Sequence, residues 1–164
     1  MEKKALYNLS YGVFMLSTRS GEKVNGCITN TCMQVANDPV RIAISVLNSN
    51  YTCDLIKESG IFALSLLDVE CSFETIKHFG FQSGRDVDKA KELGLTYEEP
   101  ETISVPGIRE LPLTLECKVI YKQTQDIHAI TEEDQEKFYP QNADGSQDIH
   151  VAYYGEIVNA YVIE

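Results

Sequence analysis

The chain has 164 residues, of which 43% are apolar, and a formal net charge of −11. A chain of this length can bury one continuous core without disulfides or a structural metal, so we expect a single domain over residues 1–164. It holds 14 lysines and arginines against 25 acidic residues. Because binding a phosphate backbone needs clustered cations, we expect no nucleic-acid partner.

The sequence also bears on location and metals. Its apolar runs are too short to cross a bilayer, and its first twelve residues lack the apolar segment of a signal peptide. Five cysteines without a CxxC pair suit small core residues in a reducing compartment better than a disulfide framework. The three histidines show no metal-ligand spacing with one another or with cysteine. We therefore expect a soluble, cytoplasmic protein with no membrane association and no metal.

The first half of the chain alternates short β-rich runs with turns. The strands expected here cover residues 12–18, 23–31, 40–47 and 61–67. The first two form a hairpin around a polar turn, and the third follows the breaker Asn37-Asp38-Pro39. Side chains of Asn48-Ser49-Asn50 offer caps for a short helix over about 51–58, which Gly60 would end.

The second half is less regular. Helices are expected over about 72–78 and 131–139, the latter capped at Thr131, and strands over 113–122 and 149–162, with 128–130 able to pair again. Residues 81–91 are expected to form an excursion, and the proline-rich stretch 98–112 an irregular surface connection. The 113–122 run alternates as a half-exposed strand should, and Gly155 suits a bulge or a bend in the last strand.

Six or seven irregularly spaced strands with helices between them indicate a mainly β fold. The pattern predicts a closed or partly closed antiparallel β-barrel decorated by short helices. The signatures GxGxxG, GxxxxGK[ST], GxSxG and HExxH are absent from the sequence, so it carries none of the common motifs for dinucleotide, triphosphate, acyl-transfer or zinc-protease chemistry.

Three clusters concentrate hydroxyl, amide and small side chains on this apolar frame. They are Asn25 to Thr31, Ser45 to Thr52 and Phe79 to Arg85. A flavin needs apolar or aromatic walls for its ring, neutral donors and acceptors along its pyrimidine edge, and N–H, hydroxyl or cationic groups at its phosphate. The clusters supply each of these types.

The order of these motifs resembles the flavin-reductase-like family. It runs from Asn-Gly-x-x-Thr-Asn-Thr at 25–31, through a strand ending Ser-x-x-Asn at 45–48, to Tyr-Thr at 51–52, which opens a helix. Phe-Gly-x-x-Ser-Gly-Arg-Asp-Val-Asp-Lys at 79–89 and His150 followed by Gly155-Glu156-Ile157 extend the similarity over nearly the whole chain. The family includes members that are fused to rubredoxin or act as flavoredoxins.

The resemblance implies an FMN-binding split β-barrel, usually a homodimer with flavin near the subunit interface. Carried over by position, Thr29, Asn30 and Thr31 match the segment that lines the isoalloxazine. Ser45, Val46 and Asn48 match the strand end beside the ring and ribityl chain. Tyr51 and Thr52 match the helix start that receives phosphate, where free N–H groups and the helix dipole also favour an anion.

Each assignment has a structural alternative. Residues 48–52 could simply cap a helix without binding a ligand. Thr29 and Thr31 could form a polar face of an exposed strand. Arg85 could be a solvated turn residue, a phosphate contact or a contact to a partner subunit. His150 could be an ordinary strand histidine or lie over the flavin, on the side of the donor or substrate.

The resemblance predicts an oxidoreductase in which flavin carries the chemistry, so no side chain need act as acid or base. The donor would be NAD(P)H or a separate redox protein such as rubredoxin, and the acceptor flavin, a rubredoxin-like protein or another molecule. The alternative is a flavin-binding module without turnover, for storage or redox sensing. A barrel that has lost its ligand is a third reading.

Overall fold

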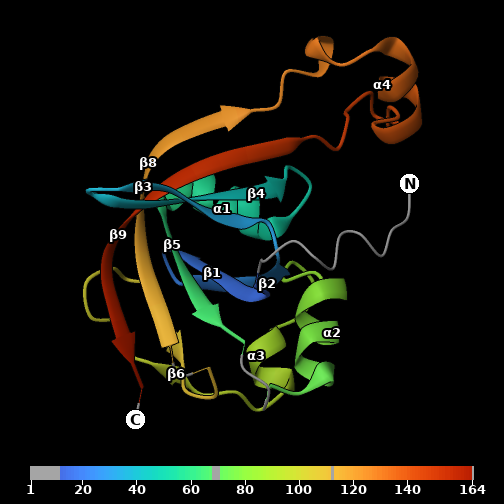
Figure 1. Ribbon diagram of the computed structural model, residues 1–164. Helices are drawn as coiled ribbons and strands as arrows, with labels where there is room; N and C mark the ends of the chain where they lie inside the picture. The colour runs from blue at the N-terminus through green and yellow to red at the C-terminus, as the bar shows by residue number, and fades with distance from the viewer. Residues whose placement is uncertain (1–11, 68–70, 112, 164) are drawn as a thin grey trace.

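The computed structural model describes residues 12–67, 71–111 and 113–163 (Figure 1). The strands of the main sheet are β1 (Phe14–Ser20), β2 (Lys23–Thr29), β3 (Cys32–Asn37), β4 (Val40–Leu47), β5 (Ile61–Leu66), β8 (Leu113–Thr124) and β9 (His150–Val162). A small second sheet pairs β6 (Tyr97–Glu98) with β7 (Gly107–Ile108). The helices are α1 (Tyr51–Ser59), α2 (Phe73–Phe81), α3 (Lys89–Glu92), α4 (Glu132–Phe138) and the 3₁₀ turn η2 (Ile127–Ala129).

The main sheet has seven antiparallel strands in the order β2-β1-β5-β8-β9-β4-β3. The predicted mainly β, antiparallel fold with short helices is therefore confirmed. Strands β2 and β3 are the two edges although only Asn30 and Thr31 separate them in sequence. They are not paired with each other in the described part of the chain, so the sheet stays open as a split barrel rather than a closed one.

The side chains of strand β4 alternate between a buried and a partly covered face of the sheet. Ile42, Ile44 and Val46 are buried in the core, while the residues between them, Ala43 and Ser45, are only partly covered. The alternation follows from the period of two in a strand, which sends successive side chains to opposite faces. The partly covered face is the one that leads to the candidate site described below.

Gly155 lies where β9 crosses the core opposite Val119, next to the register shift that leaves Ile120 unpaired on β8. A Cβ at Gly155 would lie 2.5 Å from Cζ of Phe62, which is fully buried. Glycine is therefore required by close packing beside a bulge, which agrees with the bend expected at this position.

The ends of α1 form as the sequence predicts. The Asn50 side chain accepts a hydrogen bond from Thr52 N at 3.0 Å, and Gly60 ends the helix with φ 70°, its N–H donating to Ile56 O at 2.9 Å. The left-handed conformation at Gly60 is one that residues with a Cβ rarely adopt. These caps fix the direction in which the first turn of α1 faces.

Three expectations are corrected. The strand expected over 23–31 forms as β2 but ends at Thr29, and residues 32–37, for which no strand was expected, form the separate strand β3, paired with β4. Residues 127–129 form the 3₁₀ turn η2, whose start is capped by Asp126, and not a further strand segment. Glu116 does not face solvent on a half-exposed strand: it is fully buried, because backbone N–H groups of residues 101–103 bind its carboxylate.

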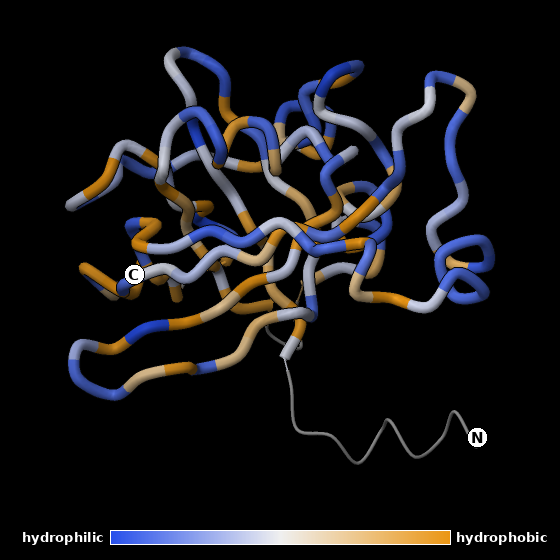
Figure 2. Tube along the Cα trace, turned by 90° about the horizontal axis from the view of Figure 1, so that it is seen from above, coloured by the Kyte–Doolittle hydropathy of each residue, from blue (hydrophilic) through white to orange (hydrophobic). Residues whose placement is uncertain are grey.

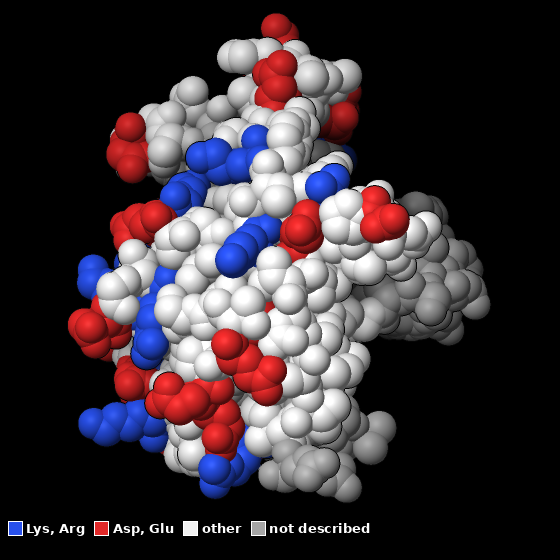
Figure 3. Space-filling model, turned by 90° about the vertical axis from the view of Figure 1, so that its left-hand side faces the viewer, with Lys and Arg blue, Asp and Glu red and all other residues white. Residues whose placement is uncertain are grey.

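Residues 125–149, between β8 and β9, form an arm that stands away from the sheet (Figure 1). Its helix α4 has no buried residue, and its trace is mostly hydrophilic in Figure 2. Acidic side chains gather on the arm at the top of the face shown in Figure 3. Among the described residues, none of the helices has the length and apolar character needed to span a bilayer.

Candidate functional site

Two adjoining cavities lie where β2, β4 and α1 meet. Cys27, Leu47 and Asn50 line both of them. The first, which we call the neutral cavity, has a volume of about 150 Å³, and the second, the cationic cavity, about 270 Å³. The two cavities are therefore neighbours, separated by no more than the three residues that line both.

The neutral cavity brings together four predicted site residues from three strands: Thr29, Ser45, Val46 and His150. Its remaining lining is apolar or uncharged, contributed by Leu16 and Ile28 with the three shared residues. His150 is opposite Leu47 in the β4–β9 pairing, which is why the last strand reaches this site. The cavity thus offers hydroxyl and imidazole groups on an apolar wall, the surroundings that a polar aromatic ring requires.

The cationic cavity is lined by Tyr51 at the start of α1, by the end of α2 and by the loop that follows it. Two of its lining residues, Arg85 and Lys89, are cationic, and none is acidic. This local excess stands against a chain that carries a net charge of −11. With the N-terminal turn of α1 beside it, the cavity has the character of an anion site.

Arg85 is held against the first turn of α1 by three contacts. Its guanidinium donates to the Asp54 carboxylate at 2.5 Å and to Ser49 O at 2.9 Å, and it lies 5.2 Å from the centre of the Tyr51 ring. The side chain is 45% exposed. Arg85 is therefore not a free turn residue. Even without a ligand, its guanidinium holds the 83–88 loop against the helix.

Lys89 is the functional candidate that the sequence did not single out. It is 4% exposed, and its ammonium donates to the carbonyl oxygens of Phe79 at 3.3 Å and Gln82 at 3.2 Å. Burial lowers the pKa of Lys89 below its ordinary value, while the neighbouring thiol of Cys27 acts in the opposite direction. Its two hydrogen bonds leave one N–H of the ammonium group for a ligand in the cationic cavity.

Asn25 and Gly84 explain why the loop lies so close to α1. The Asn25 amide donates to Thr52 Oγ1 at 2.9 Å, and a Cβ at Gly84 would lie 2.0 Å from Asn25 Oδ1. Only glycine fits this approach without displacing Asn25. Gly84 therefore allows the loop to form one wall of the cationic cavity.

Four predicted site residues do not line either cavity: Asn30, Thr31, Asn48 and Thr52. Asn30 is exposed, and Thr31 donates from its hydroxyl to Ser45 O at 2.7 Å. Thr52 is fully buried, with its hydroxyl bound to Asn25. Asn48 donates to Gln147 O at 3.1 Å, so it ties the arm to the site.

A second tie joins the arm to the same loop. The Asp148 carboxylate accepts from Ser49 N at 3.2 Å and from Ser49 Oγ at 2.9 Å. Since Ser49 O accepts from Arg85, one residue links the arm to the cationic cavity. Beside the neutral cavity, the ring of Tyr139 of the arm lies edge-on to that of His150, with centroids 6.2 Å apart.

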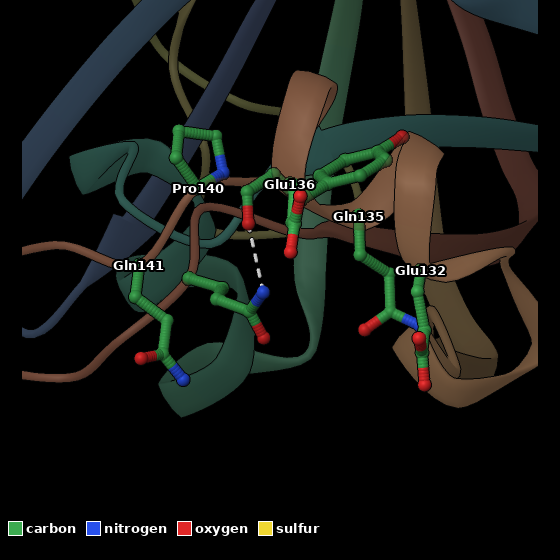
Figure 4. A pocket seen from close by; sticks show the side chains of 7 residues that line it. Glu132, Gln135, Glu136, Pro140 and Gln141 are labelled. Atoms are coloured by element: carbon green, nitrogen blue, oxygen red, sulfur yellow. Dashed lines mark hydrogen bonds between the residues drawn. The ribbon is translucent and has the colours of Figure 1, made fainter.

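The arm has a hollow of its own, of about 420 Å³. Figure 4 shows Glu132, Gln135 and Glu136 of α4 at its wall, with a dashed line for the 2.7 Å hydrogen bond from Gln147 to Tyr139 O. Its lining includes two carboxylates and no lysine or arginine. It is unsuited to a phosphate, and none of the predicted site residues lines it.

Comparison with known proteins identifies the family of the chain. The family model described as "Flavin reductase like domain" matches residues 6–164, nearly the whole chain. The chain belongs to the flavin reductase-like family. The resemblance drawn from the motifs is confirmed.

Relatives of this flavin reductase-like chain include named oxidoreductases. A protein named "Ferric-chelate reductase (NAD(P)H)" from Archaeoglobus fulgidus is 31% identical over 131 residues, 79% of this chain and 76% of the relative. "High molecular weight rubredoxin" from Moorella thermoacetica is 37% identical over 101 residues, 62% of this chain. The match spans only 43% of that relative's length.

The fold of this flavin reductase-like chain also occurs among solved structures. Flavoredoxin of Desulfovibrio vulgaris (Miyazaki F) superposes with a TM-score of 0.72 at 23% identity, covering 95% of this chain and 72% of that one. At this identity the likeness establishes the shared fold, and the site must be argued from the residues of this chain.

Proposed function

We propose that this protein is an FMN-dependent oxidoreductase. It passes electrons from NAD(P)H or a redox protein through bound FMN to an acceptor, such as free flavin or a rubredoxin-like protein. The observation that carries the proposal is the adjoining pair of cavities, one lined by neutral residues and the other by two cations. A flavin mononucleotide has this polarity, since a neutral ring system is linked by a polar chain to a phosphate.

The residues present fit FMN at each end. Thr29, Ser45 and His150 would lie along the ring, and Arg85 and Lys89 would neutralise the phosphate. Asn50, common to both cavities, would lie beside the ribityl chain. When bound there, FMN would supply the capacity to accept electrons from one molecule and give them to another. We propose that Thr31, Asn48 and Thr52 support the site from behind its lining, through their hydrogen bonds to Ser45 O, Gln147 O and Asn25, and we keep Asn30 as an exposed residue beside it.

A third hollow, of about 320 Å³, adjoins the neutral cavity through Ser45 and His150. Gln123, Gln125 and Ala152 complete its lining, so apart from His150 it holds no titratable group. We assign it to the donor or acceptor. His150 would then lie between this molecule and the flavin ring, oriented by its backbone N–H, which donates to Gln125 Oε1 at 3.0 Å, and by the Tyr139 ring.

The names of relatives support two kinds of donor. The Archaeoglobus relative is named for NAD(P)H, and the Moorella relative is named a rubredoxin. For this chain, a separate redox protein and a pyridine nucleotide are both compatible with an open third hollow. We propose the cytoplasm as its location, since five cysteines without a CxxC pair suit a reducing compartment.

The first test is the visible absorbance of the purified protein loaded with FMN, followed anaerobically by NADH, NADPH or a reduced rubredoxin. We expect a protein-bound flavin band that bleaches with at least one donor and returns when an acceptor is added. A band that stays oxidised with every donor would favour the storage or sensing module. Failure to retain any FMN through gel filtration would overturn the flavoprotein proposal.

We also propose that the protein is a homodimer, and the partly covered sheet face supports this. One row of residues crosses four strands in register: Met33, Ala43, Tyr154 and Tyr121. Met33 is 65% and Tyr121 47% exposed, an apolar strip larger than isolated surface residues provide. The same face continues through Ser45 and Ala152 to the third hollow.

Sedimentation equilibrium is expected to give twice the chain mass, and Tyr121→Glu with Met33→Glu should shift the protein to monomers by placing two charges in the strip. Lys57→Glu, on exposed α1 surface away from the strip, is the control and should remain dimeric. A wild-type protein that sediments as a monomer at micromolar concentration would contradict the dimer.

A further inference from the structure

Asp148 lies where the arm meets the cationic cavity. Its carboxylate accepts from Ser49 N at 3.2 Å and from Ser49 Oγ at 2.9 Å, and Ser49 itself lines the cationic cavity. Asp148 lines none of the cavities described above. It therefore stands behind the wall of the proposed phosphate site, and its contact with that wall runs through Ser49.

Ser49 connects Asp148 to the arginine of the cationic cavity. Its N–H and its hydroxyl both donate to Asp148, while its carbonyl oxygen accepts from Nη1 of Arg85 at 2.9 Å. An ionised carboxylate has only acceptor atoms, so it can take both donors of one serine at once. The two bonds hold Ser49 in the orientation that directs its carbonyl oxygen toward Arg85.

Arg85 depends on this carbonyl for a second anchor. Nη2 of its guanidinium donates to the Asp54 carboxylate at 2.5 Å, and Asp54 also pairs with Lys57 at 3.7 Å. Because the Arg85 side chain is 45% exposed, packing alone does not fix it. One bond to a carboxylate lets the guanidinium swing about that contact, whereas bonds at both Nη atoms hold its plane. The remaining N–H groups are then available to a ligand.

The arm segment that carries Asp148 is anchored on both sides of this residue. Asn48 donates from its backbone N–H to Ile149 O at 2.9 Å and from its side chain to Gln147 O at 3.1 Å. Both neighbours of Asp148 are thus bound to the residue that precedes Ser49. The contact between the carboxylate and Ser49 is therefore built into the chain and needs no ligand to form.

We propose that Asp148 is a positioning residue for the phosphate site, which acts through Ser49 to hold Arg85 in the orientation that binds a phosphate. The inference rests on the proposed function in placing the FMN phosphate in the cationic cavity. Without Asp148, the 48–50 turn and the guanidinium would gain freedom in the unliganded protein, and the phosphate would have to order them on binding. The loss should therefore affect FMN and spare riboflavin, which has no phosphate.

The test is a double-mutant cycle on the dissociation constant of FMN, measured from flavin fluorescence. We expect Asp148→Ala to raise this constant about fivefold in the wild-type background and to leave it unchanged in an Arg85→Ala background, because the residue acts through that guanidinium. Asp148→Asn should bind FMN as the wild type does, since its amide can accept from Ser49 N and donate to Ser49 Oγ. Riboflavin affinity should be the same in all these variants.

Asp144→Ala is the matched control. Asp144 also accepts from the backbone N–H and the hydroxyl of one serine, Ser146, but it does so within a turn of the arm, so FMN affinity should not change. The positioning role would be overturned if Asp148→Ala bound FMN like the wild type, lost as much affinity without Arg85 as with it, or lost riboflavin in parallel. Each of these results leaves the flavin proposal standing. Failure of the wild-type protein to bind FMN would instead count against the proposed function.

Discussion

Replacing Glu116 by alanine is expected to lower the free energy of unfolding by about 4 kcal/mol. The carboxylate is fully buried and accepts from backbone N–H groups of Glu101, Thr102 and Ile103 at 2.9–3.3 Å, and from the Asn159 amide at 3.1 Å. Alanine would leave these donors without their acceptor and would open a cavity where the buried carboxylate lay. Urea unfolding followed by circular dichroism measures the loss.

Two variants separate this network from a general effect of removing an acid. Glu99→Ala deletes an exposed carboxylate just before the same loop and should change stability by less than about 0.5 kcal/mol. Glu116→Gln keeps one acceptor oxygen and should give an intermediate loss. Equal urea midpoints for Glu116→Ala and Glu99→Ala would show that the loop does not depend on this carboxylate. FMN affinity should stay unchanged in all three, since Glu116 lines none of the cavities of the proposed flavin site.

Glu116 also shows where pattern reasoning fails. The alternation over residues 113–122 located β8, because side chains of a strand alternate between its faces whatever covers them. What covers each face depends on segments distant in sequence, and the irregular stretch 99–105 folds over Glu116. The period of two therefore predicted the strand, but not which of its polar residues would be buried.

Strand β3 was missed for a related reason. Residues 32–37 lie between the strands expected over 23–31 and 40–47, and only their pairing with β4 shows that they form an edge strand. Signals local in the sequence were sufficient to predict helix ends, where a side chain binds backbone a few residues away. Asn50 and Gly60 mark the ends of α1, and Thr131 accepts from Asp134 N at the start of α4, as the sequence predicts.

The candidate site was predictable in outline. Hydroxyl and amide clusters on separate segments indicated the strand ends that the structure brings together, and Thr29, Ser45 and His150 do line one cavity. Lys89 was missed although it closes the Ser-Gly-Arg-Asp-Val-Asp-Lys motif, because a lysine is by default a surface residue. Its burial under α2 results from tertiary packing, and the motif was the one signal that could have pointed to it.

Lys89→Met is expected to raise the dissociation constant of FMN about 30-fold, equivalent to about 2 kcal/mol. Methionine keeps the length and apolar stem of the side chain but removes the ammonium that, in the proposal, donates to the phosphate. Riboflavin provides the sharpest control, because it has the same ring and ribityl chain without a phosphate. Its affinity should be unchanged in Lys89→Met if the residue acts on the phosphate, and reduced if the substitution only disturbs α2. Lys91→Met, on the exposed side of α3, should leave both affinities as in the wild type.

The pH dependence of binding gives an independent check on the same residue. In the proposal the charged form of Lys89 binds the phosphate, so FMN affinity should be retained below the pKa of this lysine and fall as pH rises through it. Because burial lowers that pKa from the ordinary value of 10.5, the decline should begin at lower pH than an exposed lysine would cause. Riboflavin affinity should lack this decline, and so should FMN affinity in Lys89→Met. A wild-type FMN titration that matches the variant's profile at every pH would remove Lys89 from the phosphate site and leave Arg85 as its cation.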